Sequence, residues 1–279
     1  MSTYLHDALD NFINQRNVEK IQKSLQKRGI TVERLLTALN GPNLNVTKTI
    51  TKFNTCALVG SSGILSNSSC GNEINAHDLI IRENGAELDG FEEDVGDRTD
   101  MMSFNTMSCI YLAHCLRETK KQKGGTPPTC YKRYINHVNQ LRNAIILFPL
   151  VGHIEREDRQ KQVDICLEII KEEQVPLDLR APDFNTTQFV MDLMGQSREP
   201  SAGIRMLAFS FTFCRQISLY GFYPFTTLPN GKPVNYHYFD DGFTGNVIHN
   251  MTEEFQILTK LNSDHTIRLV SDKCTREMV

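Results

Sequence analysis

The 279-residue chain lacks the features that mark a membrane-spanning or nucleic-acid-binding protein. No apolar run reaches the roughly eighteen residues of a membrane span, and the N-terminal sequence MSTYLHDALD lacks the basic-then-apolar order of a signal peptide. The 30 Lys and Arg residues against 33 Asp and Glu give a net charge of -3, too small to attract nucleic acid or an anionic membrane. We therefore expect the chain as given to be soluble and to hold any anionic ligand through local groups.

Several short motifs and internal repeats are also absent. The eight cysteines form no CxxC pair, which argues against zinc ribbons and CxxC redox sites. The dinucleotide motif GxGxxG is missing, which disfavours a dinucleotide-dependent oxidoreductase. With 40% hydrophobic and 23% charged residues, the chain can instead bury the core of one large domain or two small ones.

Four Asn-X-Ser/Thr sequons, at Asn45, Asn67, Asn185 and Asn250, raise the question of the compartment. Sequons in an oxidising lumen can carry glycans, and eight cysteines can form disulfides there. Sequons also arise by chance, so these counts leave a cytosolic protein equally open.

Helical and strand-like periodicities alternate along the chain, which predicts an α/β fold with a mostly parallel central sheet flanked by helices. Residues 1–49 are predicted to form an N-terminal helical stem or packing arm, with Gly29 as a helix terminator, and residues 50–279 the main domain. We predict strands at 55–60, 78–84, 144–149, 216–222 and 266–271, helices at 107–118, 131–143, 158–173, 201–214 and 252–261, and an ambiguous stretch at 175–184.

The predicted helix 107–118 contains two cysteines and one histidine, but their spacing matches no standard zinc arrangement. We expect Cys109, His114 and Cys115 to pack in the core. The acidic stretch FEEDVGDRTD lacks the ligand spacing of a calcium loop, so we expect a solvated turn there.

The first predicted strand ends in the turn GSSG. Gly60 and Gly63 would let backbone amides approach a ligand, and Ser61 and Ser62 add hydroxyl groups, which suits a phosphate or ribose at the carboxyl end of a parallel strand. A plain connection between elements is the alternative interpretation, because glycine turns commonly follow strands.

Polar groups also occur at the next strand end and at the start of a later helix. Residues 82–84, Arg-Glu-Asn, end the second predicted strand, either facing a ligand or simply solvated. Ser201 is a natural N-cap, and the amides of Ala202 and Gly203 at the positive end of the helix could hold one phosphate. Ordinary helix capping explains this second pattern equally well.

Two histidines have surroundings that suit chemistry. His237 stands among aromatic residues and carboxylates in YHYFDD, residues 236–241, which can orient an imidazole or move its pKa, although packing beside tyrosines is the alternative. His249 precedes a helix that we expect Thr252 to cap, with Glu254 in its first turn. An imidazole at this place can project into a cleft as a general base or lie in a surface loop.

The order and residues of four segments resemble the four sialylmotifs of animal sialyltransferases. Among these enzymes, the α2,8-sialyltransferases are the most similar in the sequence segments NSSCG, LYGFYPF and NYHYFDD and in DVGDRTDMMSFN, which ends at Asn105. The resemblance runs from about residue 50 to Cys274. The four segments are CALVGSSGILSNSSCGNEINAHDLIIREN (56–84), PSAGIRMLAFSFTFCRQISLYGFYPF (200–225), YHYFDD (236–241) and HNMTEEF (249–255).

This resemblance implies a variant nucleotide-binding, GT-A-like glycosyltransferase fold for residues 50–279. It implies inverting transfer of sialic acid from CMP-sialic acid to a sialylated glycolipid or glycoprotein, without metal or another cofactor. The full-length protein would be a Golgi type II membrane protein, held by an N-terminal anchor. The implied donor-binding residues are Gly60, Ser61, Ser62, Asn84, Asn105, Ser201, Ala202, Gly203 and Tyr236; His237 would lie against the phosphate, His249 would be the base, and Glu254 would orient it or cap the helix.

Two positions depart from the family pattern. The family usually has Asn where Ser61 stands and Thr where Ala202 stands, which would weaken two donor contacts. A catalytically weak or inactive relative that binds a nucleotide or a sialoglycan is therefore the alternative function.

The family pattern also pairs four of the cysteines. It implies disulfides between Cys56 and Cys214 and between Cys70 and Cys274, which in turn imply the secretory lumen. The remaining cysteines have no counterpart in the pattern, and we expect free, buried thiols at Cys109, Cys115, Cys130 and Cys166.

Overall fold

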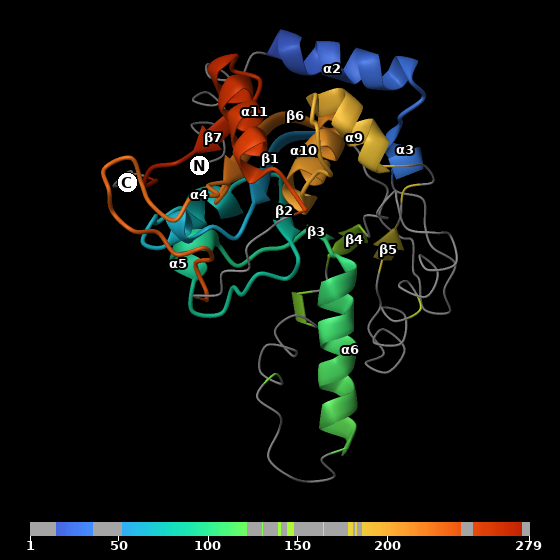
Figure 1. Ribbon diagram of the computed structural model, residues 1–279. Helices are drawn as coiled ribbons and strands as arrows, with labels where there is room; N and C mark the ends of the chain where they lie inside the picture. Colours follow the sequence, from blue (N-terminus) through green and yellow to red (C-terminus); the bar gives the residue numbers. More distant parts are fainter. Residues whose placement is uncertain are drawn as a thin grey trace.

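A seven-stranded sheet forms the centre of the protein in its computed structural model (Figure 1). Every pairing between neighbouring strands is parallel, in the order β5-β4-β3-β2-β1-β6-β7. This confirms the predicted α/β fold with a parallel sheet. The structure describes residues 15–35, 52–121, 130, 139–140, 144–147, 164, 178–180, 182, 186–240 and 248–274.

The described elements follow the alternation of the sequence. The strands are β1 (Phe53–Val59), β2 (Leu79–Glu83), β3 (Met101–Ser103), β4 (Ile145–Leu147), β5 (Asp178–Arg180), β6 (Cys214–Tyr220) and β7 (Arg268–Val270). The helices are α2 (Gln15–Lys27), α3 (Val32–Leu35), the 3-10 helix η1 (Gly63–Leu65), α4 (Gly71–Asn75), α5 (Glu92–Val95), α6 (Thr106–Lys121), α9 (Thr186–Met194), α10 (Ala202–Phe213) and α11 (Met251–Ser263).

All five predicted strands and three of the predicted helices correspond to observed elements. The predicted helices 131–143 and 158–173 lie largely outside the described residues, as does the predicted boundary at residue 49. The ambiguous stretch contains β5. In the N-terminal segment, α2 ends before Gly29, which has a φ of 70° as a helix-terminating glycine does.

Strand β1 has a buried layer on each face because successive side chains of a strand point to opposite sides. Cys56 and Leu58 belong to the core cluster that includes most apolar residues of α10 and reaches α2. Ala57 and Val59 belong to a second cluster with Ile74 of α4 and with residues of α5. Strand β1 is thus buried on both faces, as its continuous apolar sequence predicts.

The strand order creates a topological switch point beside β1. From β1 the chain proceeds through β2, β3, β4 and β5 on one side, whereas β6 and β7 lie on the other side. Connections leave β1 and β6 in opposite directions, so a crevice is expected at the carboxyl ends of these strands. The turns that follow the two strands begin at Gly60 and Gly221.

Two disulfides close long stretches of chain, as the resemblance implied. Cys56–Cys214 joins β1 to β6 with a Cα–Cα distance of 6.0 Å, and Cys70–Cys274 joins the start of α4 to the segment after β7 with 4.9 Å. On the chain-entropy account, loops of this length give about 5 kcal/mol of stabilisation each.

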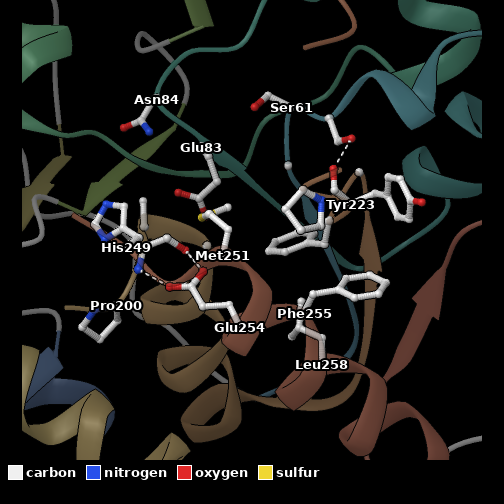
Figure 2. A pocket seen from close by; sticks show the side chains of 18 of the residues that line it. Ser61, Glu83, Asn84, Pro200, Tyr223, His249, Met251, Glu254, Phe255 and Leu258 are labelled. Carbon is white, nitrogen blue, oxygen red and sulfur yellow. Dashed lines mark hydrogen bonds between the residues drawn. The ribbon is translucent and has the colours of Figure 1, made fainter. Parts of the chain in front are cut away.

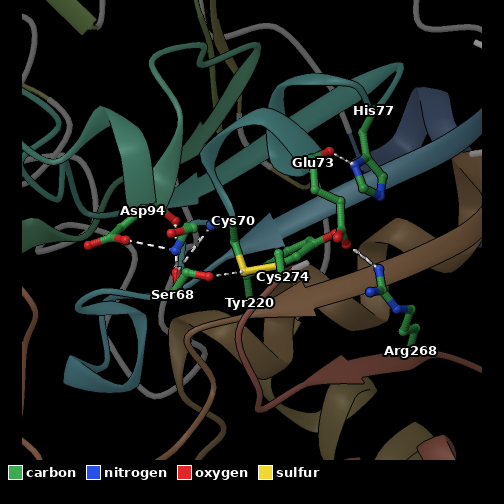
Figure 3. The surroundings of a disulfide bond; sticks show 9 residues. Ser68, Cys70, Glu73, His77, Asp94, Tyr220, Arg268 and Cys274 are labelled. Atoms are coloured by element: carbon green, nitrogen blue, oxygen red, sulfur yellow. Dashed lines mark hydrogen bonds and ion pairs between the residues drawn. A yellow bond between two sulfur atoms is a disulfide. The ribbon is translucent and has the colours of Figure 1, made fainter. Parts of the chain in front are cut away.

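An ionic cluster lies beside the second disulfide and links α4, β6 and β7 (Figure 3). The Glu73 carboxylate accepts a hydrogen bond from the Tyr220 hydroxyl at 2.6 Å and forms an ion pair with Arg268. Arg268 also donates to the Tyr220 oxygen at 3.3 Å, and the ring of His77 bonds the Glu73 carbonyl through Nδ1 at 3.0 Å. The three elements are thereby fixed to one another.

The expectation of free, buried thiols is wrong for two cysteines. Cys115 and Cys130 form a disulfide with a Cα–Cα distance of 5.9 Å, and no cysteine among the described residues is free. The Cys109 side chain and Cys166 lie outside the described residues. Core packing is also wrong for His114, which is exposed because α6 extends away from the sheet (Figure 1).

The acidic stretch 91–100 is only partly the solvated turn that we expected, because most of its residues are at least partly exposed but it also contains a short helix. It contains α5, whose Val95 is fully buried, and the Asp94 carboxylate accepts hydrogen bonds from the amides of Asn67 and Ser69 at 2.7 and 2.8 Å. These bonds hold a turn in which Asn67 and Ser69 both have positive φ.

None of the helices in the described ranges is long and apolar enough to cross a membrane.

Candidate functional site

A cavity of about 350 Å³ opens at the carboxyl ends of β1, β2 and β6 (Figure 2). Its size suits a small-molecule ligand. Segments that lie up to 198 residues apart in the sequence contribute to its wall, from Gly60 to Leu258. All the residues predicted for donor binding and catalysis line it: Gly60, Ser61, Ser62, Asn84, Asn105, Ser201, Ala202, Gly203, Tyr236, His237, His249 and Glu254.

The glycine turn after β1 packs directly on the turn after β6. The Gly60 amide donates to the Tyr220 carbonyl at 2.8 Å, and a Cβ atom at Gly60 would lie 2.6 Å from the Gly221 oxygen. The Ser62 hydroxyl also donates to a backbone carbonyl, at 2.6 Å. Close backbone packing therefore explains the glycine, and Figure 2 shows the Ser61 side chain on the cavity wall.

Two asparagines shape the wall beside β2 and β3. Asn84 follows β2 with a φ of 53°, and its Oδ1 accepts the Asn105 amide at 3.0 Å. Asn105 in turn caps α6, because its Oδ1 accepts the Ser108 amide at 2.8 Å. Because Oδ1 of Asn84 accepts the Asn105 amide, the Nδ2 group of Asn84 is the part of this side chain that can donate to a ligand.

His237 is held by a carboxylate and an aromatic ring. Its Nδ1 lies 2.8 Å from Oδ1 of Asp240, and its ring stacks on Phe239 with 4.9 Å between centroids. A backbone bridge to Ser62 docks this segment on the turn after β1. The surroundings of aromatic and acidic groups predicted from YHYFDD are confirmed, and Nε2 is left to face a ligand.

Tyr236 stays protonated at neutral pH. Burial, and to a lesser extent the Glu254 carboxylate, raises the pKa of its phenol.

The N-terminus of α10 carries a bound carboxylate. Ser201 caps this helix, with its Oγ accepting the Ile204 amide at 3.4 Å, as predicted. Glu254 of α11 accepts the Ser201 amide at 2.8 Å and the Ser201 hydroxyl at 2.6 Å (Figure 2). Glu254 thus ties α11 to α10, while the first-turn amides of Ala202 and Gly203 have no acceptor within the helix.

His249 has a defined tautomer. Its Nδ1 lies 2.8 Å from the Glu199 carbonyl oxygen, which can only accept, so Nδ1 carries the hydrogen and Nε2 is the basic nitrogen of the neutral ring. Glu199 is itself fixed by an ion pair with the buried Arg205 of α10 at 2.9 Å. The imidazole is therefore positioned by the segment that leads into α10.

The cap of α11 differs from the prediction. Asn250, not Thr252, is the N-cap, and its side chain accepts the Glu253 amide at 3.3 Å. Both residue types cap helices, so local propensity did not distinguish them. The helix begins at Met251, directly after His249 and its neighbour.

Comparison with known proteins decides the family. The profile described as glycosyltransferase family 29 (sialyltransferase) matches residues 6–266. The chain belongs to the sialyltransferases of this family.

The curated relatives of this sialyltransferase chain include alpha-2,8-sialyltransferase 8E of Rattus norvegicus, 25% identical over 80% of this chain and 57% of the relative. Another is the alpha-N-acetylneuraminide alpha-2,8-sialyltransferase of Xenopus laevis, 25% identical over 80% of this chain and 60% of the relative. The chain therefore spans little more than half the length of these relatives.

Solved structures show the same fold. A crystal structure of a mammalian sialyltransferase is 20% identical, with a TM-score of 0.52 over 93% of this chain and 79% of the other. A second, in complex with Gal-beta-1-3GalNAc-ortho-nitrophenol, is also 20% identical, with a TM-score of 0.53 over 95% and 89%. The sheet and its helices thus have the same fold as these solved sialyltransferases.

The sequence alone does not give roles to three charged residues that line this cavity, Glu83, Glu199 and Arg205. Arg205 carries a signal, because it is the one charged residue of its helix and so needs a buried partner. Glu83 is 8% exposed, so the end of β2 faces the cavity side and is not simply solvated. Among the described residues, no three His, Cys, Asp or Glu side chains are arranged to hold a metal ion.

Proposed function

We propose that this chain transfers sialic acid from CMP-sialic acid to a sialylated glycan, forming an α2,8 linkage with inversion. The observation that carries the proposal is the convergence of four sequence-distant segments on one cavity, with His249 positioned beside the start of α10. The names of the curated relatives support the α2,8 linkage and the sialylated acceptor.

The first requirement of this reaction is to stabilise the negative charge on the departing phosphate. The bond between the tertiary anomeric carbon of sialic acid and the CMP phosphate breaks, so the transition state resembles an oxocarbenium ion and negative charge grows on the departing phosphate. The amides of Ala202 and Gly203, with the positive end of α10, and the ring of His237 would stabilise this single charge. We therefore propose that transfer needs no divalent metal, and that activity survives excess EDTA.

Proton removal from the acceptor is the second requirement. A sugar hydroxyl must lose its proton as the new bond forms. With Nδ1 of His249 donating to the Glu199 carbonyl, Nε2 is the nitrogen that would accept this proton. Glu254 acts as a positioning residue, because its carboxylate fixes Ser201 at the start of α10.

An oxidising compartment suits the described disulfides, so we also propose that the protein works in the Golgi lumen, where an N-terminal anchor of the full-length protein would hold it. The acceptor would be a sialylated glycolipid or glycoprotein.

The direct test incubates the purified protein with CMP-sialic acid and a sialylated oligosaccharide and identifies the product linkage by mass spectrometry. We expect a new α2,8-linked residue and one released CMP for each transfer. Binding of CMP without product would instead support the inactive relative suggested by Ser61 and Ala202.

A further inference from the structure

Glu83 is a buried carboxyl group at the cavity wall whose oxygens have no hydrogen-bond partner within the described part of the chain. It is the last residue of β2, is 8% exposed, and lines the cavity with Asn84 and Asn105. Figure 2 shows its side chain projecting from the strand end into the cavity, toward the side where Met251 and His249 lie. Neither carboxyl oxygen makes a hydrogen bond of normal geometry with any described residue.

This lack of a partner contrasts with the other polar side chains around it. Asn84 bonds the Asn105 backbone, Asn105 caps α6, and Glu254 binds Ser201. A buried polar group without a partner costs free energy, so such groups are rare unless a ligand or water satisfies them. Burial raises the pKa of Glu83 to about 8, against a smaller opposing effect of the Ser103 hydroxyl on β3.

We infer that the neutral carboxyl group of Glu83 donates a hydrogen bond to an anionic oxygen of the bound sugar nucleotide. This inference rests on the proposed function, which places an anionic ligand in the cavity. An ionised carboxylate here would repel that ligand, whereas a neutral carboxyl supplies a donor that the ligand needs. The anionic oxygen belongs to the phosphate or to the sialic acid carboxylate.

Proton linkage makes this contact measurable. Because an anion favours the protonated form of Glu83, affinity should fall as pH rises above the pKa of the free site, by at most tenfold for each pH unit. Other groups around the cavity also carry or gain charge. They are Glu199 and Arg205 before and in α10, Tyr223 after β6, Tyr236 and His237 in the third motif, and His249 and Glu254 at α11.

The variant Glu83→Gln separates the titration of Glu83 from the titration of all these other groups, because a carboxamide keeps a hydrogen-bond donor and does not titrate. Isothermal titration calorimetry would measure the Kd of CMP between pH 7.5 and 9.5. We expect the wild-type Kd to rise about tenfold across this range. Glu83→Gln should bind within about threefold of wild type at pH 7.5 and show a flat profile.

Further variants and ligands guard this test. Glu83→Met, which removes the donor and is apolar, should bind about tenfold more weakly at pH 7.5 and also show a flat profile. Glu93→Gln, the same change at an exposed position of α5 outside the cavity, should keep the wild-type profile. Neutral cytidine should show no rise in Kd with pH in any of the proteins.

Two ligands distinguish the anionic oxygens. A rise in Kd with CMP assigns the contact to the phosphate, and a rise confined to a non-transferable CMP-sialic acid analogue assigns it to the carboxylate. The same pH profile in wild type and Glu83→Gln with both ligands, or tighter binding by Glu83→Met, would overturn the inference alone. A wild-type protein that binds neither ligand would overturn the proposed function as well.

Discussion

Two buried or partly buried glutamates on neighbouring segments of the chain have opposite surroundings. Glu73 on α4 lies between Arg268 and Tyr220, both of which bond its carboxylate (Figure 3). Glu83 at the end of β2 projects into the cavity, and no described residue bonds it (Figure 2).

Their pKa values differ accordingly. Burial alone would raise the pKa of Glu73, but the hydrogen bond and charge of Arg268, with the Tyr220 hydroxyl, outweigh burial and lower it. Burial of Glu83 meets only a weak opposing effect, and its pKa rises to about 8. The comparison separates Glu73, a carboxylate that holds the fold together, from Glu83, a carboxyl group without a hydrogen-bond partner among the described residues at a ligand site.

The largest expected effect concerns the cavity. His249→Ala should lower turnover by about 10²- to 10⁴-fold, because the general base is lost, while the Kd of CMP and the Tm stay close to wild type. Steady-state rates, calorimetry and thermal unfolding measure these quantities. His114→Ala, at an exposed histidine of α6, is the matched control and should leave all three unchanged. Lost CMP binding without a separate effect on rate would make His249 a structural residue.

The next effect is a pH dependence of stability. The pKa of Glu83 is higher in the folded than in the unfolded protein, so its contribution to the free energy of unfolding is lost as pH rises from about 4.3 to about 8. Glu83→Gln lacks this loss, so its free energy of unfolding should gain about 4 kcal/mol relative to wild type between pH 4 and pH 8. Urea unfolding at several pH values tests this, with Glu93→Gln as control. A stability difference that stays constant with pH would contradict the raised pKa.

A smaller loss is expected at the paired glutamate. Glu73→Gln leaves Arg268 partly buried without its counter-charge and should lower the free energy of unfolding by about 2 kcal/mol. Because the pKa of Glu73 is lowered on folding, wild type should lose this advantage only as pH falls below about 4.3. Lys121→Met, which breaks an exposed ion pair with Glu118, should leave the free energy of unfolding almost unchanged. Equal losses in the two variants would remove the distinction.

The smallest expected effect tests a departure from the family pattern. Ser61→Asn places the usual family residue on the cavity wall and should raise kcat/KM for CMP-sialic acid by about threefold to tenfold, the value of one added hydrogen bond. Transfer rates at low donor concentration measure it. A decrease would show that the cavity is adapted to serine.

The sequence predicted the fold and the residues that line the cavity, because both depend on local sequence signals. Apolar runs such as TCALVG indicated buried strands, and polar residues at their carboxyl ends had to meet at one edge of a parallel sheet. The cap at Ser201 was likewise readable from neighbouring residues. Strand β3, with three residues, is too short to give a periodic signal.

What could not be predicted depends on contacts between distant segments. The partners of Glu73 come from β6 and β7, far away in the sequence, and the residues around Glu73 and Glu83 do not show which of the two is paired. The same holds for Glu254, whose partner Ser201 lies 53 residues away. The disulfide of Cys115 depends on where residue 130 returns to α6.

The central claim is that the start of α10 holds the phosphate of CMP-sialic acid while His249 faces the acceptor. A crystal structure with a non-transferable CMP-sialic acid analogue tests it most directly. We expect the phosphate within hydrogen-bond distance of the Ala202 or Gly203 amide, and Nε2 of His249 directed at the space beside the anomeric carbon. A nucleotide bound elsewhere, or a His249 ring turned away from the sugar, would contradict the account.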